Sequence, residues 1–333
     1  MPTSWSGWGA GCASGSRVEG GRRLSDLLDI FTSAALYAAA IRLALPVFFA
    51  ALGEVFAERS GLVNVGLEGM MLMAAFGGVL GSDLTGSPMM GLLLGLVFAL
   101  VIAAVQAFVA VNLGGDQIVS GIALNITALG LTAYLSRAIW EGGNVPQVNG
   151  FPTLDPPILS DIPILGPILF EQSLFVYIAA VAVAVSWWAL TRTAWGLRLR
   201  ACGEDPRASD SLGIDVIRVR WQTMLICGAL AGLGGAFLSL GSLFTFSDAM
   251  TGGRGFIALA VVIIASWSPV KAVWASLLFS LCEAFALRVQ TSDIELPAEL
   301  MLALPYVVTL IVYAVIVGRT AMPAALGRTY VRE

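Results

Sequence analysis

Nine apolar runs, most of them long enough to cross a membrane, dominate this sequence. They lie at residues 33–56, 62–82, 89–112, 117–139, 173–191, 221–243, 256–269, 270–289 and 298–318. A helix of about 20 apolar residues crosses about 30 Å of hydrocarbon, and it satisfies its own backbone polar groups there. The runs therefore predict an all-α polytopic transmembrane helical bundle of about 8–10 spans.

The composition agrees with a membrane protein and excludes several kinds of chemistry. Of the 333 residues, 58% are hydrophobic and 12% are charged, whereas soluble domains are about a quarter charged. The absence of histidine excludes imidazole catalysis and histidine metal ligands. Four cysteines (Cys12, Cys202, Cys227 and Cys282) stand apart without a CxxC pair, and the chain has no phosphate-binding loop of the G-x-x-x-x-G-K-S/T type. We therefore expect no enzyme activity, metal or cofactor in this chain.

Arginine is distributed unevenly between the connections, and this predicts the orientation. The 192–220 connection carries six arginines, whereas the 140–172 connection has no lysine or arginine and four acidic residues. Because positive residues are retained inside, we predict that 192–220 is a cytoplasmic loop and 140–172 an extracytoplasmic one. Counting spans makes residues 320–333 a cytoplasmic tail. The side of the N-terminus stays open, because counting puts it outside and the three arginines before residue 24 favour the inside.

The chain divides into a tail and one membrane domain. Residues 1–30 are rich in glycine, serine and tryptophan and lack an apolar run typical of a signal peptide, so we predict a disordered tail. Residues 31–319 form the transmembrane domain. Six prolines in the 140–172 connection favour a stiff external lid that docks a partner, with an ordinary long loop as the alternative.

Two parts of the membrane domain share a pattern of helix, polar glycine-containing break and helix. They lie at Leu43–Gly81 and Cys227–Ser268. An odd number of spans separates them, which predicts an inverted repeat of the kind that transporters use for two-sided access. The runs 62–82 and 256–269 are candidates for broken or re-entrant helices.

The first break carries the most informative polar residues. Backbone and side-chain polar groups within lipid survive only where they face protein or water. Asn64 and Glu68 are four residues apart and share one helical face. They predict, together with Gly66, a polar pathway across the membrane. The alternative is that both side chains only cap or join neighbouring helices.

Other intramembrane polar residues leave two interpretations open. Asn125 can meet a polar solute or form a hydrogen bond across a helix interface. Arg42, Glu54 and Glu283 are either pathway residues or members of ion pairs, and the sequence does not decide between the two.

The arginine-rich loop contains a short helix with clear boundaries. Asp205 and Pro206 form a helix start, and Gly213 is a stop signal. A short capped cytoplasmic helix is suited to docking into a groove on another protein. It can also lie on lipid headgroups.

Four segments, in this order, resemble the membrane permease subunits of ABC importers. They are Glu58–Met70, Gln117–Asn125, Gly203–Ala208 followed by Leu212–Ile214, and Gly253–Ala260. The resemblance covers about residues 34–318 and is closest to the simple-sugar and nucleoside branch, related to the ribose and branched-chain amino acid permeases. It implies a permease that alternates between outward-open and inward-open states in the bacterial inner membrane. The solute would be a nucleoside or a simple sugar.

The resemblance also implies partners and roles for particular residues. Two cytoplasmic ATPase subunits, a second permease and an extracytoplasmic solute-binding lipoprotein would complete the importer, with no nucleic acid partner. The ATPase coupling residues would be Arg200, Gly203, Asp205, Pro206, Arg207, Asp210 and Gly213. The pathway residues would be Asn64, Gly66, Glu68, Asn125 and Arg254.

One rival function follows from the intramembrane carboxyl groups. A secondary transporter could be driven by protons through Glu54, Glu68 or Glu283. A membrane-embedded enzyme is disfavoured, because the sequence has no histidine and no nucleophile clustered with a base.

Overall fold

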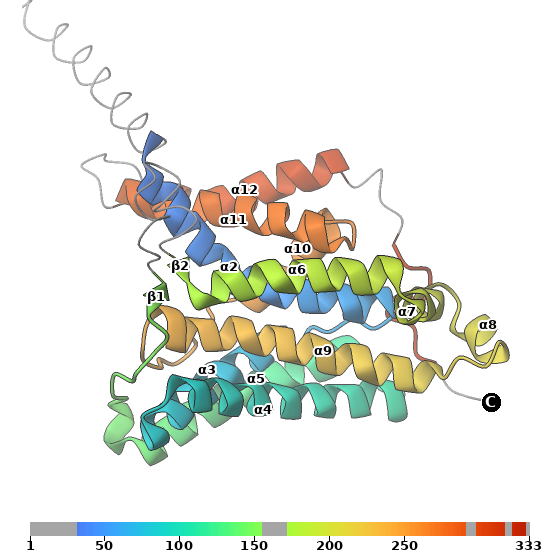
Figure 1. The fold of residues 1–333 in the computed structure, drawn as a ribbon, viewed down its shortest axis with the longest axis horizontal. Coiled ribbons are helices and arrows are strands. Elements are labelled where there is room, and N and C mark those ends of the chain that lie inside the picture. Colours follow the sequence, from blue (N-terminus) through green and yellow to red (C-terminus); the bar gives the residue numbers. More distant parts are fainter. Residues whose placement is uncertain (1–31, 155–171, 291–297, 317–321, 331–333) are drawn as a thin grey trace, which may run out of the picture.

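The computed structural model describes residues 32–154, 172–290, 298–316 and 322–330, and these form a bundle of helices (Figure 1). The helices are α2 (Ala34–Arg59), α3 (Leu67–Thr85), α4 (Pro88–Ala107), α5 (Gln117–Ile139), α6 (Leu174–Arg192), α7 (Ala194–Glu204), α8 (Pro206–Ser211), α9 (Val216–Phe237), α10 (Arg254–Ile264), α11 (Pro269–Gln290) and α12 (Ala298–Ile316). Short helical turns are η1 (Phe108–Asn112), η2 (Glu141–Gly143) and η4 (Leu238–Ser242), and the two strands are β1 (Thr153–Leu154) and β2 (Gln172–Ser173), which pair antiparallel.

The predicted all-α polytopic bundle is confirmed. Within the described residues, seven helices are long and apolar enough to cross a membrane, namely α2, α3, α4 with η1, α5, α6, α9 with η4, and α11. The run at 256–269 forms the short helix α10, whereas the run at 62–82 gives the continuous helix α3 after an irregular stretch. The predicted tail at residues 1–30 lies outside the described residues.

The arginine-rich connection and the connection without lysine or arginine lie at opposite ends of the bundle. Figure 1 shows α7 and α8 at one end, and β1 and β2 at the other. At the β-strand end, Arg42 Nε of α2 donates to Gln172 Oε1 at 3.3 Å. At the opposite end, Arg59 Nε donates to the Trp267 carbonyl oxygen at 2.9 Å. α2 therefore runs from the extracytoplasmic to the cytoplasmic end, if the arginine-rich end is inside.

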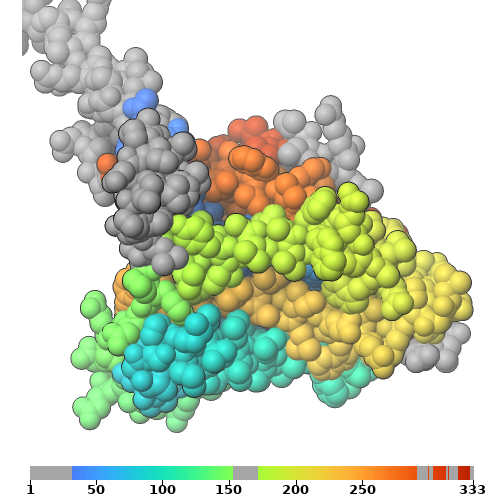
Figure 2. Space-filling view, in the orientation of Figure 1, coloured from blue at the N-terminus to red at the C-terminus, as the bar shows by residue number. Residues whose placement is uncertain are grey.

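Three helices form the centre of the bundle. In α3, 78% of the most apolar window is buried, and in α2 and α9 the share is 67%, against 22% in α5 and α6. α6 lies on the outside, across the face between α4 and α11 (Figure 2). The exposed apolar faces of α5 and α6 are therefore available to lipid or to another membrane chain.

The two parts predicted to form an inverted repeat begin with helices that run in opposite directions, and the repeat itself stays a prediction. α2 runs toward the end that carries α7 and α8, and α9 runs the opposite way to η4, which lies beside residues 148–151. There Phe151 N–H donates to the Leu240 carbonyl oxygen, and Val148 N–H donates to that of Phe244, both at 2.8 Å. The connection 243–253 then returns into the bundle, where α10 begins. Of the predicted external lid, residues 155–171 lie outside the described residues.

Glycines set the close contact between α3 and α4. A Cβ added at Gly95 of α4 would lie 2.6 Å from the carbonyl oxygen of Ala74 in α3. The same contact is repeated one turn away, where a Cβ at Gly91 would lie 2.5 Å from the Gly78 carbonyl oxygen. This small-residue spacing is the usual way in which membrane helices approach backbone to backbone.

We predict that Gly95→Ala destabilises the protein by about 1–3 kcal/mol, because the added methyl group meets a backbone atom that cannot rotate away. Thermal unfolding of the purified protein in detergent measures the effect. Gly130→Ala in α5 is the matched control, since a Cβ there has no neighbour within 4 Å. Equal melting temperatures for the two variants would contradict the packing assigned to Gly95.

Candidate functional site

The break between α2 and α3, at residues 60–66, is held by buried side chains. Glu54 Oε1 accepts a hydrogen bond from Asn64 N–H at 2.7 Å, and Asn64 Oδ1 accepts one from Gly66 N–H at 3.1 Å. Asn64 Nδ2 donates to Cys227 Sγ at 3.3 Å, and both Glu54 and Asn64 are fully buried. Asn64 and Gly66 thus shape the irregular backbone from inside the protein.

Asn125 of α5 joins the two sides of this break. Its Nδ2 donates to the Val65 carbonyl oxygen at 2.9 Å, and its Oδ1 accepts from Gly69 N–H at 2.8 Å. One amide therefore satisfies two backbone groups that the start of α3 leaves unpaired. Asn125 therefore forms the hydrogen bonds between helices that the sequence allowed, and it also lines a hollow, while contact with a solute stays a prediction.

Glu68 of α3 binds the first turn of α10. Its Oε1 accepts from Gly253 N–H and its Oε2 from Gly255 N–H, both at 2.7 Å. The first amides of a helix have no partner within it and form the positive end of the helix dipole, so a carboxylate is favoured there. A Cβ at Gly255 would lie 2.5 Å from the Glu68 backbone nitrogen, so glycine is what lets the two helix starts come this close.

A hollow of about 300 Å³ opens beside this junction. Glu68, Asn125 and Thr251 supply polar groups, and the remaining walls are mostly apolar: Leu72, Ile122, Ile126, Leu129 and Phe256. The hollow faces the exposed side of α5, where Ile126 is 67% exposed. A largely apolar concavity with a few fixed polar groups is typical of a small-molecule site.

Arg254 lies next to this hollow but points to another helix. Its Nη2 forms an ion pair with Glu283 Oε1 of α11 at 3.1 Å, and both side chains are mostly buried. Its Nη1 donates to the Thr251 carbonyl oxygen at 3.3 Å. Arg254 therefore fixes the 251–254 turn against α11, and Glu283 is a member of an ion pair.

The predicted cytoplasmic helix is present as α8. Asp205 Oδ1 accepts from the N–H groups of Arg207 and Ala208, both at 3.0 Å, and Pro206 is the first helical residue. Gly213 ends the turn with φ +81°. Arg207 is exposed, Asp210 is partly buried, and Leu212 beside them is 82% exposed. This region forms the protruding yellow end of the molecule in Figure 2.

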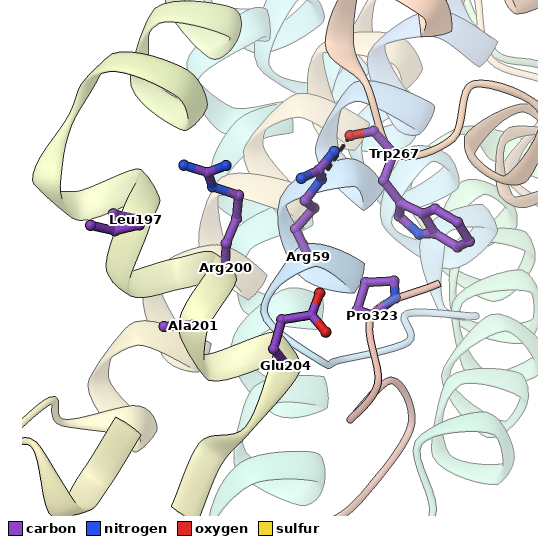
Figure 3. Close-up of a pocket in the computed structure, with 7 residues that line it drawn as sticks. All are labelled: Arg59, Leu197, Arg200, Ala201, Glu204, Trp267 and Pro323. Atoms are coloured by element: carbon purple, nitrogen blue, oxygen red, sulfur yellow. Dashed lines mark hydrogen bonds between the residues drawn. The ribbon is translucent and has the colours of Figure 1, made fainter. Parts of the chain in front are cut away.

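The preceding helix, α7, brings two of the predicted coupling residues, Arg200 and Gly203, close to Arg59 at the end of α2. Gly203 is buried, and a Cβ added there would overlap the Arg59 carbonyl oxygen. Arg200 lines a hollow of about 360 Å³ with Arg59, Glu204 and Trp267 (Figure 3). Figure 3 shows the guanidinium groups of Arg59 and Arg200 on the same edge of this hollow.

The cysteines within the described residues are not paired in disulfides. Cys202, Cys227 and Cys282 are free thiols, and burial raises the pKa of the Cys202 thiol above its ordinary value. Within the described part of the chain, no group of three or more histidine, cysteine, aspartate or glutamate side chains could hold a metal ion. Cys12 lies outside the described residues.

Comparison with known proteins identifies the family. The family described as "Branched-chain amino acid transport system / permease component" matches residues 36–313. The chain therefore belongs to this permease family, which makes it a membrane transport subunit.

Relatives from several organisms match most of the chain. The nucleoside ABC transporter permease NupC of Lactococcus lactis is 37% identical over 86% of this chain and 94% of its own length. The guanosine ABC transporter permease NupQ of Bacillus subtilis is 34% identical over 92% and 98%. A putative glucose ABC transporter permease of Haloferax volcanii is 34% identical over 90% and 98%. In the first two organisms a second, more distant permease also matches, namely NupB at 26% and NupP at 28% identity, each over 72% of this chain.

Some residues of the site were not singled out from the sequence. The backbone donors of Gly253 and Gly255 and the buried Arg220 are the main ones. A run of three glycines and one arginine at 252–255, directly before an apolar helix, was a usable signal for an open helix start. Nothing local indicated which carboxylate would bind it.

We predict that Glu68→Gln lowers the free energy of unfolding by about 1–3 kcal/mol, because an amide replaces a charge-assisted acceptor and can accept through one oxygen only. Thermal unfolding in detergent measures this. Glu141→Gln is the control, since Glu141 is exposed in η2. An unchanged free energy of unfolding in Glu68→Gln would show that the carboxylate does not hold α10.

Proposed function

We propose that this chain is the permease subunit of an ATP-driven importer that moves a nucleoside or a simple sugar across the cytoplasmic membrane by alternating access. The observation that supports it most is the similarity, over nearly the full length, to permeases named for nucleosides, guanosine and glucose. The path for the solute runs past the junction of α3 and α10, with Glu68 and Asn125 on its wall.

The chemistry of the hollow favours an uncharged solute that is rich in hydrogen-bonding groups. Asn125 and Thr251 offer polar groups, and Phe256 offers an aromatic ring. The Glu68 carboxylate is already bound by two backbone amides, which leaves little charge to attract a cation. A weak site of this kind is sufficient, because a separate solute-binding lipoprotein supplies the affinity.

The ATPase docks on α8 and the end of α7. α8 is short, capped at both ends and exposed at the arginine-rich end of the bundle, which suits insertion into a groove of a cytoplasmic partner. The coupling residues are those that cap or orient this loop: Arg200, Gly203, Asp205, Pro206, Arg207, Asp210 and Gly213. Two permeases from one organism match this chain in both L. lactis and B. subtilis, which supports a second, different permease as its membrane partner.

We predict that Asp205→Ala abolishes most solute-stimulated ATP hydrolysis by the assembled complex. The variant loses the oxygen that caps α8, a contact of about 0.5–2 kcal/mol. Asp205→Asn retains an oxygen cap and is the matched control, with activity near the original. Hydrolysis assays on complexes of equal subunit content decide between them, and normal coupling in Asp205→Ala would reject the α8 assignment.

A second candidate function is a proton-driven transporter. It is favoured by one observation, the fully buried Glu54, which has no arginine or lysine among its hydrogen-bond partners in the described residues. Uptake measurements in cells separate the two functions. We expect uptake to stop when ATP is depleted at constant membrane potential and to continue with an uncoupler at constant ATP. The opposite pattern would favour the proton-driven transporter.

A further inference from the structure

Residues 322–330, named here the C-terminal strap, fold back between the α7–α8 loop and the break at 60–66. Ala325 N–H donates to the Gly203 carbonyl oxygen at 2.9 Å, which fixes the strap to the end of α7. Gly327 N–H donates to the Gly61 carbonyl oxygen at 3.0 Å, which fixes it to the break. Ala325 and Tyr330 are buried, so this is a packed contact. The strap therefore touches both the docking loop and the break.

Arg220 of α9 contacts both the break and the strap. It is 1% exposed, and it is among the largest fully buried side chains of the described residues. Its Nε donates to the Ser60 carbonyl oxygen at 3.4 Å, and its Nη1 donates to the Arg328 carbonyl oxygen at 3.2 Å. Burying a guanidinium group is costly unless it is hydrogen-bonded, so both oxygens are held near it. Arg220 thus joins the break to the strap.

These three segments also meet backbone to backbone. Gly61 has φ +91°, and a Cβ there would lie 2.9 Å from Arg220 Nη2 and 3.2 Å from the Ala325 carbonyl oxygen. Gly203 packs directly on the Arg59 carbonyl oxygen. Backbone against backbone leaves no rotamer that can absorb a displacement. A shift of the α7–α8 loop is passed on to the break.

The break leads on to the hollow. Asn125 holds Val65 and Gly69 on its two sides, and Glu68 lies between them at the start of α3. Movement of residues 60–66 therefore changes the position of Glu68 relative to the first turn of α10. The strap and the start of α8 together line a groove of about 750 Å³, beside Asp205 and Arg207. The strap thus contacts the docking loop through Ala325 and the break, which leads to Glu68, through Gly327.

We propose that the C-terminal strap, with Arg220 as its positioning residue, transmits the movement of the ATPase docking loop to the α2–α3 break and so to the solute path. The proposal rests on the proposed function, in which an ATPase docks on α8. In this proposal, the movement reaches the break through residues 322–330, and α8 serves only to dock the ATPase. The strap is needed to convert hydrolysis into transport and is not needed for hydrolysis.

The first test compares Arg220→Lys with Arg218→Lys. Lysine retains the charge but lacks the forked donors, so it cannot hold both carbonyl oxygens. Arg218 is the matched control, because it lies on the same helix with a side chain that is 76% exposed. Each variant is assembled with its ATPases, second permease and binding protein in lipid vesicles, with radiolabelled guanosine and glucose as the two solute probes.

The measured quantity is solute taken up per ATP hydrolysed. For Arg220→Lys we expect this ratio to fall about fivefold or more, the range of a typical coupling energy between sites, at unchanged subunit content and hydrolysis. For Arg218→Lys we expect no change. A merely structural Arg220 would lower assembly, hydrolysis and uptake together and leave the ratio constant.

A second test removes the strap without touching the helices. Deletion of residues 322–333 is compared with deletion of residues 331–333, which leaves the strap whole. We expect only the longer deletion to lower the ratio, and we expect Arg220→Lys to add nothing to it, because both changes act on one element. An unchanged ratio in the longer deletion, or additive losses, would overturn the proposal. A complex with the original sequence that takes up both probes without hydrolysing ATP would reject the proposed function itself.

Discussion

The contact on which the rest of the site depends is the carboxylate of Glu68 against the first amides of α10. In an apolar interior, an open helix start and a carboxylate are each costly, and together they compensate for one another. α10 can therefore begin inside the bundle, where α3 also begins, and not at an aqueous face. The hollow beside Glu68 exists because two helix starts meet there and the 251–253 turn does not fill the space.

The other buried polar groups follow the same principle. Glu54, Asn125 and Arg220 each bind backbone groups of the break at residues 60–66 or of its flanks. Within a membrane, irregular backbone persists only where its amides and carbonyls find partners in protein or water. These side chains are therefore both the support of the break and the reason that it can exist at this depth. Asn125, a predicted pathway residue, is thus also a support of the backbone, and its contact with a solute stays a prediction.

Local features of the structure were predictable from the sequence, and long-range ones were not. Hydropathy located the seven long apolar helices of the described residues, and the Asp205, Pro206 and Gly213 signals located α8, because each depends on neighbouring residues only. The bond between Glu68 and Gly253 joins residues 185 positions apart, and no local pattern specifies it. Arg220 was counted with the cytoplasmic arginines, yet it is buried, because carbonyl oxygens from two distant segments surround it.

In the proposed importer the permease receives a movement made by its ATPase partner, and this restricts how the end that carries α7 and α8 can be built. A long side chain between the α7–α8 loop and the membrane helices could rotate, and its rotation would absorb part of such a movement. Gly61 and Gly203 have no side chain at this position. Amides and carbonyl oxygens of α7, the break and the strap therefore lie within hydrogen-bonding distance of one another. The cost of this arrangement is a buried guanidinium group, whose Nε and Nη1 donate to carbonyl oxygens of the break and of residues 322–330 and whose Nη2 has no hydrogen-bond partner within the described residues. The same contacts that hold this end together therefore form a continuous series from Gly203 of α7, through residues 325–327, to the break before Glu68.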